Sequence, residues 1–295
     1  MKRNIDVVVF NCISYTMVAL LSIISILPFV MLISGSFSSE SYIVNNGYPI
    51  FPKQFNTVAY QQIFSNPQKI INAYGISIFV TATGTALGLF LIAMTAYVLS
   101  RKDFIYKNHF SLFFFFTTLF TGGMMVTYIW MIKYLGMSDK IYSLILPGLM
   151  PVMYIMIMRT FITTSIPDSL IEAAKIDGGG DYFIFAKIVL PLLKPALASI
   201  GLFMALGYWN NWSNTMLYIR NDKLYSLQYL LYKMMQDLNY LQSMAGSLEL
   251  LDVIDSPSES FKLAMTVVAI GPIVFLYPFV QKYFIRGMTV GAVKG

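Results

Sequence analysis

The chain has 295 residues, of which 57% are hydrophobic and only 12% are charged. Charged residues make up about a quarter of a soluble domain, so this composition excludes an ordinary soluble protein and requires lipid to cover the apolar surface. The one cysteine, Cys12, excludes an intrachain disulfide and a cysteine-based metal cluster. The one histidine, His109, excludes a cluster of histidine ligands.

Six apolar runs divide the chain, and a helix needs about 20 such residues to cross a bilayer. We therefore expect an all-α integral membrane protein with six transmembrane helices. The first run is too long for the core of a signal peptide, and no small-residue cleavage site follows it, which predicts an uncleaved span. The expected spans are Val7–Ile33, Ile71–Leu99, Phe110–Met131, Ile141–Met158, Ile188–Trp209 and Leu263–Val280.

Basic residues are unevenly distributed between the two sides of this arrangement. With the N-terminus in the cytoplasm, the cytoplasmic segments contain 12 of the 20 Lys and Arg residues but only 6 of the 14 Asp and Glu residues. The whole net charge of +6 then falls on the cytoplasmic side, in agreement with the positive-inside rule. Both termini are therefore expected in the cytoplasm.

The expected spans contain small residues but no acidic ones. Gly84 and Gly88 in the second span, and Ala198, Gly201 and Ala205 in the fifth, have the spacing that lets helices pack closely in lipid. Proton- and sodium-coupled carriers usually need ionisable groups within the membrane. The absence of Asp and Glu from the spans therefore argues against a self-energised carrier, although carbonyl and hydroxyl groups can also bind sodium.

The polar segment between the fourth and fifth spans predicts a short cytoplasmic helix. Ser165 and Pro167 are typical of a helix start, and Asp168 would then lie at the positive end of the helix dipole. The glycines Gly178–Gly180 indicate the end of this helix, and a second helix is expected to begin near Asp181. An exposed amphipathic helix of this kind is suited to a groove on a partner protein.

The same segment contains a spaced pattern of Glu-Ala-Ala, three residues, Gly, nine residues and Ile-x-Leu-Pro. This pattern resembles the signature of permease subunits of binding-protein-dependent ABC importers. The resemblance covers nearly the whole chain and is to the carbohydrate branch, which is maltose-permease-like, and within it to permeases for complex oligosaccharides. The matching residues are Glu172, Ala173, Ala174, Gly178, Ile188, Leu190 and Pro191, with Asp177 and Pro195 beside them.

The resemblance implies that the short helix is a coupling helix. In this family such a helix docks in a cleft of the ATPase subunit and transmits the closure of that cleft to the spans. Glu172 would be the main polar contact, and Ala173 and Ala174 would allow close approach. Gly178, preceded by Asp177, would form the turn.

Aromatic and amide side chains at the outer end of the fifth span are the candidates for contact with substrate, because sugars are recognised by aromatic faces and hydrogen-bonding groups. They are Trp209, Asn210, Asn211 and Trp212, and an interfacial aromatic belt is the alternative interpretation.

Tyr128 is a further substrate-path candidate, with simple packing as the alternative. It ends a run from Gly122 that resembles the G-G-M-I-P-T-Y sequence of the branch. Met125 and Val126 replace the Ile and Pro of that sequence, so no kink is expected there.

The resemblance implies one permease domain. Its tail closely resembles that of the branch, which reaches the ATPase interface, and Arg286 and Gly287 are the expected contacts. The long external loop would reach into a sugar-binding protein, as the equivalent loop does in relatives. The expected parts of the domain, residues 1–295, are a core of residues 71–281, a coupling segment of residues 164–195, the external loop of residues 210–262 and a cytoplasmic tail of residues 282–295.

No ATP-binding motif of the form G-x-x-x-x-G-K-[ST] occurs in the chain. The resemblance therefore implies a transport subunit without catalytic residues, metal site or cofactor of its own, and ATP and Mg²⁺ would bind to a partner ATPase. The expected partners are a homologous permease in a heterodimer, two ATPase subunits, an extracellular or periplasmic sugar-binding protein and membrane lipid, but no nucleic acid. The expected function is import of a carbohydrate, specifically an oligosaccharide, across the bacterial cell membrane.

Two other classes of protein stay open on the sequence. A membrane-embedded enzyme acting on lipid-linked sugar would need acid–base or metal groups near the interface, and the chain has one histidine and few acids near its spans. A secondary carrier is disfavoured by the absence of acidic residues from the spans. Co-purification with an ATPase would separate the importer from both alternatives.

Overall fold

The computed structural model describes residues 5–248, 258–272 and 274, and all regular secondary structure in these residues is helical. This confirms the predicted all-α class. The chain packs as two compact units, and each is described by itself. Unit 1 comprises residues 1–70 and 231–271, and unit 2 comprises residues 71–230 and 272–295.

Unit 1 contains a long apolar helix, α1 (Ile5–Ser36), followed by two short ones, α2 (Glu40–Asn46) and α3 (Val58–Ile63). The side chains of α1 from Val7 to Val30 are almost all exposed although most of them are apolar. A helix of this length and composition can cross a membrane, and lipid would cover the surface that the chain itself leaves bare.

A carboxylate in unit 1 joins two segments that are far apart in the sequence. Glu40 accepts hydrogen bonds from the backbone N–H groups of Glu259 and Ser260, at 2.8 and 2.9 Å, and from the Ser260 hydroxyl at 2.9 Å. These groups begin the helix of residues 259–272. A carboxylate at a helix N-terminus satisfies free donors and interacts favourably with the helix dipole, so Glu40 fixes this helix to the segment after α1.

Unit 2 holds most of the helices. Helix α4 begins in unit 1 and continues in unit 2, whereas α14 begins in unit 2 and lies mostly in unit 1. The elements of unit 2 are α4 (Pro67–Ser100), α5 (Lys107–Leu119), α6 (Gly123–Ile129), the π-helical η1 (Trp130–Tyr134), α7 (Tyr142–Ile145), the 3₁₀ turn η2 (Leu146–Gly148), α8 (Val152–Ser165), α9 (Asp168–Ile176), α10 (Asp181–Ile184), the π-helical η3 (Phe185–Val189), α11 (Leu190–Leu192), α12 (Lys194–Trp209), α13 (Ser213–Tyr218), the 3₁₀ turn η4 (Asp222–Leu224) and the start of α14 (Leu227–Leu248).

Glycines on α4 allow the core of unit 2 to pack closely. A Cβ atom on Gly84 would lie 2.5 Å from the ring of Tyr208 on α12, and one on Gly88 would lie 2.8 Å from the carbonyl oxygen of Leu149. Small residues at this spacing permit close approach of helices. The structure therefore confirms the packing interpretation of the two glycines, within one chain.

Three of the expected spans are bent helix pairs. The segments α5 and Gly123–Tyr134 meet at 110°, Tyr142–Gly148 and α8 at 50°, and Asp181–Leu192 and α12 at 77°. Two helices, Asp6–Ser36 and α4, are long and apolar enough to span a membrane by themselves, and the described residues give up to five spans if each bent pair counts as one. The sixth expected span begins in the helix of residues 259–272 and continues outside the described residues.

The third span has no kink at the position where none was expected, but it is bent elsewhere. No break occurs at Met125 or Val126, where α6 is continuous, but the span is sharply bent a few residues earlier. Phe120 has an extended backbone, and Gly123 has φ +77°. A glycine pair readily adopts conformations that end a helix, and this pair breaks the span without any proline.

Candidate coupling site

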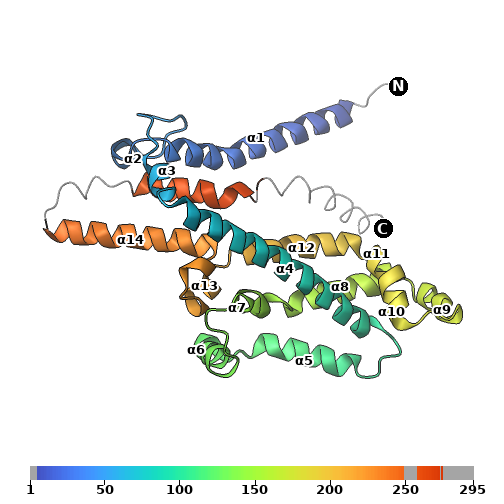
Figure 1. The fold of residues 1–295 in the computed structure, drawn as a ribbon. Helices are drawn as coiled ribbons and strands as arrows, with labels where there is room; N and C mark the ends of the chain where they lie inside the picture. Colours follow the sequence, from blue (N-terminus) through green and yellow to red (C-terminus); the bar gives the residue numbers. More distant parts are fainter. Residues whose placement is uncertain (1–4, 249–257, 273, 275–295) are drawn as a thin grey trace. The chain divides into compact units, whose positions relative to one another are not determined.

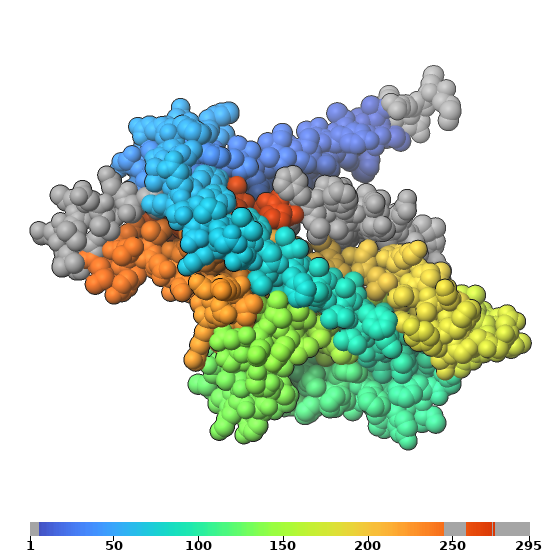
Figure 2. Space-filling view, viewed as in Figure 1, coloured from blue at the N-terminus to red at the C-terminus, as the bar shows by residue number. Residues whose placement is uncertain are grey.

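Helix α9 follows α8 and precedes α10 in the chain, in the segment that contains the Glu-Ala-Ala pattern, and in Figure 1 it is the outer one of the pair α9 and α10. With α10 it forms a projection at one end of unit 2 (Figure 2, yellow). Helix α8 includes Ser165, so the prediction that Ser165 begins α9 was wrong. The break falls at Ile166, which is extended because the residue before a proline avoids helical geometry, and Pro167 occupies the cap position.

The two sides of α9 differ in burial. Ile171 is 6% exposed and, with Ile162 and Ile166, lines a cavity of about 340 Å³. On the outward side Leu170 is 41% exposed and Ile176 is 86% exposed. One side of the helix is therefore held by unit 2, whereas the other presents large apolar side chains that none of the described residues covers.

Glycines end α9, as predicted. The N–H group of Gly179 donates to the carbonyl oxygen of Ala174 at 2.9 Å, and Gly178 has φ +84°, a conformation that side chains with a Cβ atom rarely adopt. A Cβ atom on Gly179 would lie 2.7 Å from the same carbonyl oxygen, whereas one on Gly180 would meet nothing within 4 Å. The predicted second helix, α10, begins at Asp181.

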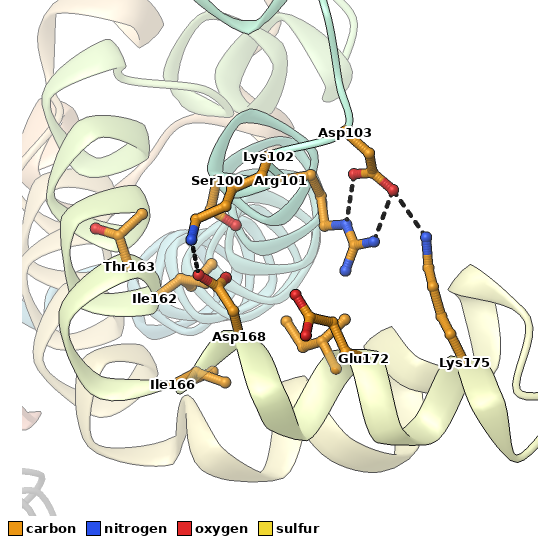
Figure 3. Close-up of a pocket in the computed structure, with 11 residues that line it drawn as sticks. Ser100, Arg101, Lys102, Asp103, Ile162, Thr163, Ile166, Asp168, Glu172 and Lys175 are labelled. Atoms are coloured by element: carbon orange, nitrogen blue, oxygen red, sulfur yellow. Dashed lines mark hydrogen bonds and ion pairs between the residues drawn. The ribbon is translucent and has the colours of Figure 1, made fainter.

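Ion pairs hold both ends of α9 to the residues that follow α4 (Figure 3). At the first turn, Lys102 Nζ lies 2.6 Å from Asp168 Oδ2. At the last turn, Lys175 Nζ lies 2.8 Å from Asp103 Oδ2. Because Lys102 and Asp103 are neighbours in the sequence, one short segment fixes the helix at its two ends.

Asp103 is also bound by Arg101, whose Nε and Nη2 atoms donate to its two oxygens at 3.0 and 2.8 Å. The hydrogen bonds from Arg101 and then Lys175 hold the pKa of the Asp103 carboxyl well below its ordinary value. Since the folded-state pKa is lowered, the stabilisation is complete above about pH 4 and is lost only as the pH falls through the folded-state value. The carboxylate therefore stays charged at physiological pH.

Glu172 lies between the two ion pairs and lines the same cavity (Figure 3). Its carboxylate makes no hydrogen bond or ion pair with any residue that the structure describes. Ala173 and Asp177 are exposed and Ala174 is half-buried. The predicted coupling residues are thus brought together on α9 and the turn after it.

Sequence reasoning missed the ion-pair network. Arg101, Lys102 and Lys175 counted only as charges on the cytoplasmic side, and Asp103 only as an acid. Lys175 and Asp103 are 72 positions apart, and no pattern in one sequence pairs residues at that separation. The basic cluster directly after the second span was the one available signal.

The substrate-path candidates do not converge on one cavity. Trp209 is 6% exposed and lines an apolar cavity of about 480 Å³ with Thr81 and Thr85 of α4. Asn211 lines a different cavity of about 370 Å³ beside Tyr154 and Tyr208.

Hydrogen bonding, exposure and ring stacking distinguish the substrate-path candidates from one another. The Asn211 Oδ1 atom accepts the N–H group of Asn214 at 3.0 Å, in the first turn of α13. Asn210 is exposed at the end of α12, and Trp212 is 38% exposed. The ring of Tyr128 stacks on that of Tyr218, with 6.2 Å between centroids, which favours packing for Tyr128.

The expected contacts of the cytoplasmic tail, Arg286 and Gly287, lie outside the described residues. Within the described part of the chain, no group of three or more His, Cys, Asp and Glu side chains is placed to hold a metal ion.

Comparisons with known proteins identify the family. No protein-family model matches the chain. The polygalacturonan/rhamnogalacturonan transport system permease protein YtcP of Bacillus subtilis is 38% identical over 97% of this chain and 98% of its own length. The arabinooligosaccharides transport system permease protein AraQ of Halalkalibacterium halodurans is 29% identical over 94% of both.

The fold agrees with these relatives. A crystal structure of a bacterial ABC transporter involved in the import of the acidic polysaccharide alginate contains a chain with a TM-score of 0.77 and 29% identity, matching 96% of this chain and 99% of that one. This chain therefore belongs to the family of sugar ABC importer permeases. The chain is a transport subunit of the cytoplasmic membrane, and the ATPase activity of the importer belongs to a separate subunit. The family therefore replaces the enzyme and the secondary carrier as alternative interpretations.

The three adjacent glycines provide a matched test of the turn. We expect Gly179→Ala to displace the end of α9, because its Cβ atom would press on a backbone carbonyl, at a cost of about 1–3 kcal/mol. Gly180→Ala enters open space and serves as the control. The measurement is the amount of ATPase subunit that remains bound to the purified permease. Equal retention by both variants would contradict this account of the turn.

Proposed function

We propose that the chain carries an oligosaccharide across the membrane. The relatives named for their substrates support this class, since they are named for polygalacturonan/rhamnogalacturonan, arabinooligosaccharides and galactooligosaccharides, and the solved structure for alginate. Uptake by the reconstituted importer, tested with galacturonate and alginate oligomers beside neutral oligosaccharides, checks the proposal. Transport of monosaccharides alone would contradict it.

The exposed surface of α9 is proposed as the surface that docks on the ATPase. The proposed coupling residues are Glu172, at the mouth of the cavity, and Ala173, Ala174, Asp177 and Gly178. The observation that carries this proposal is the unusual surface of a short helix outside the apolar spans. Ile176 is 86% exposed, and the carboxylate of Glu172 makes no hydrogen bond or ion pair with the described residues. Exposed apolar side chains around one charged group are suited to a protein interface.

The proposed assembly is a heterodimer of this chain with a homologous permease, two ATPase subunits and a sugar-binding protein outside the membrane. ABC importer systems, to which the relatives belong, include an ATPase and a binding protein. In this proposal ATP and Mg²⁺ bind to the ATPase subunits, and the chain needs no cofactor. Arg286 and Gly287 of the tail would add to the ATPase contact.

Six spans with both termini in the cytoplasm, forming one permease domain of residues 1–295, complete the proposal. Contacts between loops support this topology, because each joins loops that six spans place on the same side. The segment after α4 binds α9 through Lys102 and Asp168. On the opposite side, the Asp139 carboxylate accepts the backbone N–H groups of Arg220 and, at 2.8 Å, Asn221.

Reversing the charge at Glu172 tests the docking surface. We expect Glu172→Lys to lower substrate-stimulated ATP hydrolysis and uptake by about tenfold or more, as expected for a desolvated interface charge. The measurement uses the reconstituted importer with its binding protein. The control is Asp6→Lys, which makes the same charge change at an exposed acid on the proposed cytoplasmic side. The docking role is wrong if the two variants behave alike.

Impermeant maleimide labelling of whole cells tests the topology. Because Cys12 is the only cysteine, a Cys12→Ser parent allows single cysteines to be placed at will. We expect Lys223→Cys to be labelled in intact cells, and Asn108→Cys and Gly295→Cys to be labelled only after permeabilisation. Labelling of either of the last two in intact cells would exclude the six-span arrangement.

A further inference from the structure

The end of α4 and the end of α9 are joined by a cluster of charges rather than by one ion pair. Two of its members have been described, the Asp103 carboxylate and the Arg101 guanidinium that binds both of its oxygens. Asp181, the first residue of α10, lies 3.6 Å from Lys175 Nζ and 4.0 Å from Arg101 Nη2. The cluster therefore includes residues from both sides of the glycine turn.

The geometry of this cluster is more constrained than that of an isolated surface pair. The Arg101 side chain is only 14% exposed, against 56% for Asp103 and 38% for Lys175. An exposed single ion pair contributes little to stability, because two long side chains must be ordered to form it. A bidentate Arg–carboxylate contact or a network of charges has a more fixed geometry and contributes more. Asp103 is the member that contacts both α9 and the cation at the end of α4.

Aromatic contacts link the same cluster to the helical segment after α10. The Arg101 guanidinium lies 5.7 Å from the centre of the Tyr97 ring. The Tyr97 and Phe185 rings have centroids 5.5 Å apart, and Phe185 is 4% exposed in η3. The last turn of α4 thus contacts the chain after the glycine turn through Tyr97, and the residues directly after α4 contact the chain before that turn through Asp103.

Helix α4 leads from this cluster to the interior of unit 2. It is 34 residues long, and its residues Thr81 and Thr85 line the apolar cavity that contains Trp209. About three to four turns separate these threonines from Tyr97, along one continuous helix. A displacement of the end of α4 would therefore reach the wall of this cavity.

We propose that Asp103 is the positioning residue that joins the movement of α9 to that of α4. This inference rests on the proposed docking of α9 on the ATPase. With the ion pairs intact, a pull or push on α9 acts on α4 through Lys175, Asp103 and Arg101. Without Asp103, the last turn of α9 loses its link to Arg101, so that ATPase closure moves α9 with less displacement of α4.

The test is the amount of sugar taken up per ATP hydrolysed by the whole importer in lipid vesicles. We expect Asp103→Asn to lower this ratio about fivefold, in the range of coupling within a charge network, with the ATPase still bound. Lys175→Met removes the α9 side of the pair and is expected to cause the same loss. The double variant should lower the ratio no further than either single variant does, because both substitutions remove the same interaction between Lys175 and Asp103.

Controls separate this role from a purely structural one. Asp103→Glu keeps the charge and is expected to restore most of the ratio, whereas Asp6→Asn, an exposed acid elsewhere, should leave it unchanged. If uptake and hydrolysis fall in proportion in both single variants, or if the ratio is unaffected, the positioning role of Asp103 is overturned. If Asp103→Asn does not fold, Lys175→Met decides the question.

The failure of the docking proposal has a different signature. In that case Glu172→Lys leaves ATP hydrolysis unchanged in the same vesicles. Loss of ATPase binding with Glu172→Lys, together with an unchanged uptake ratio for Asp103→Asn, would retain the docking surface and reject only the link to α4.

Discussion

The attachment of α9 to the rest of unit 2 is the constraint on which the account depends. A nine-residue helix is marginal in water by itself, because helix nucleation is costly and few hydrogen bonds repay it. Here the buried Ile171 and the ion pairs of Lys102 and Asp103 with its two ends supply the stability. The helix can therefore leave its other face exposed and still keep one orientation, which a docking element requires.

The broken spans raise a second physical question, since a backbone carbonyl exposed to lipid is costly. The break between α7 and α8 shows one solution. The hydroxyl group of Tyr208 on α12 donates to the carbonyl oxygen of Ile145 at 2.8 Å, and both residues are buried. Gly84 on α4 provides the room for the same ring. The small residue Gly84 thus makes room for the tyrosine whose hydroxyl group binds the free backbone carbonyl at the break.

Local sequence patterns predicted the elements well where the cause was local. Apolar runs identified α1 and α4, and the glycines after Ile176 identified the end of α9. The start of α9 was misplaced because Ser165 is a good helix cap only if the preceding helix has already ended. The bend before α6 was not predicted, because it arises at the glycine pair of residues 122 and 123 and involves no proline.

The site was predictable only in part. The residues of the Glu-Ala-Ala pattern are contiguous, so the sequence places them on one helix. The pairing of Lys175 with Asp103, and the separation of Trp209 and Asn211 into two cavities, depend on how distant helices pack. Such contacts have no periodic or local signature, and they emerge only when the fold is known.

Cross-linking from the two faces of α9 tests the central claim most directly. In a Cys12→Ser parent, Ile176→Cys places a thiol on the exposed face and Ile171→Cys places one on the buried face. A short cysteine-to-lysine reagent is applied to the assembled importer. We expect a covalent adduct with the ATPase subunit from position 176 and none from position 171. Adducts from 171, or none from 176, would show that α9 does not dock through the face left exposed here.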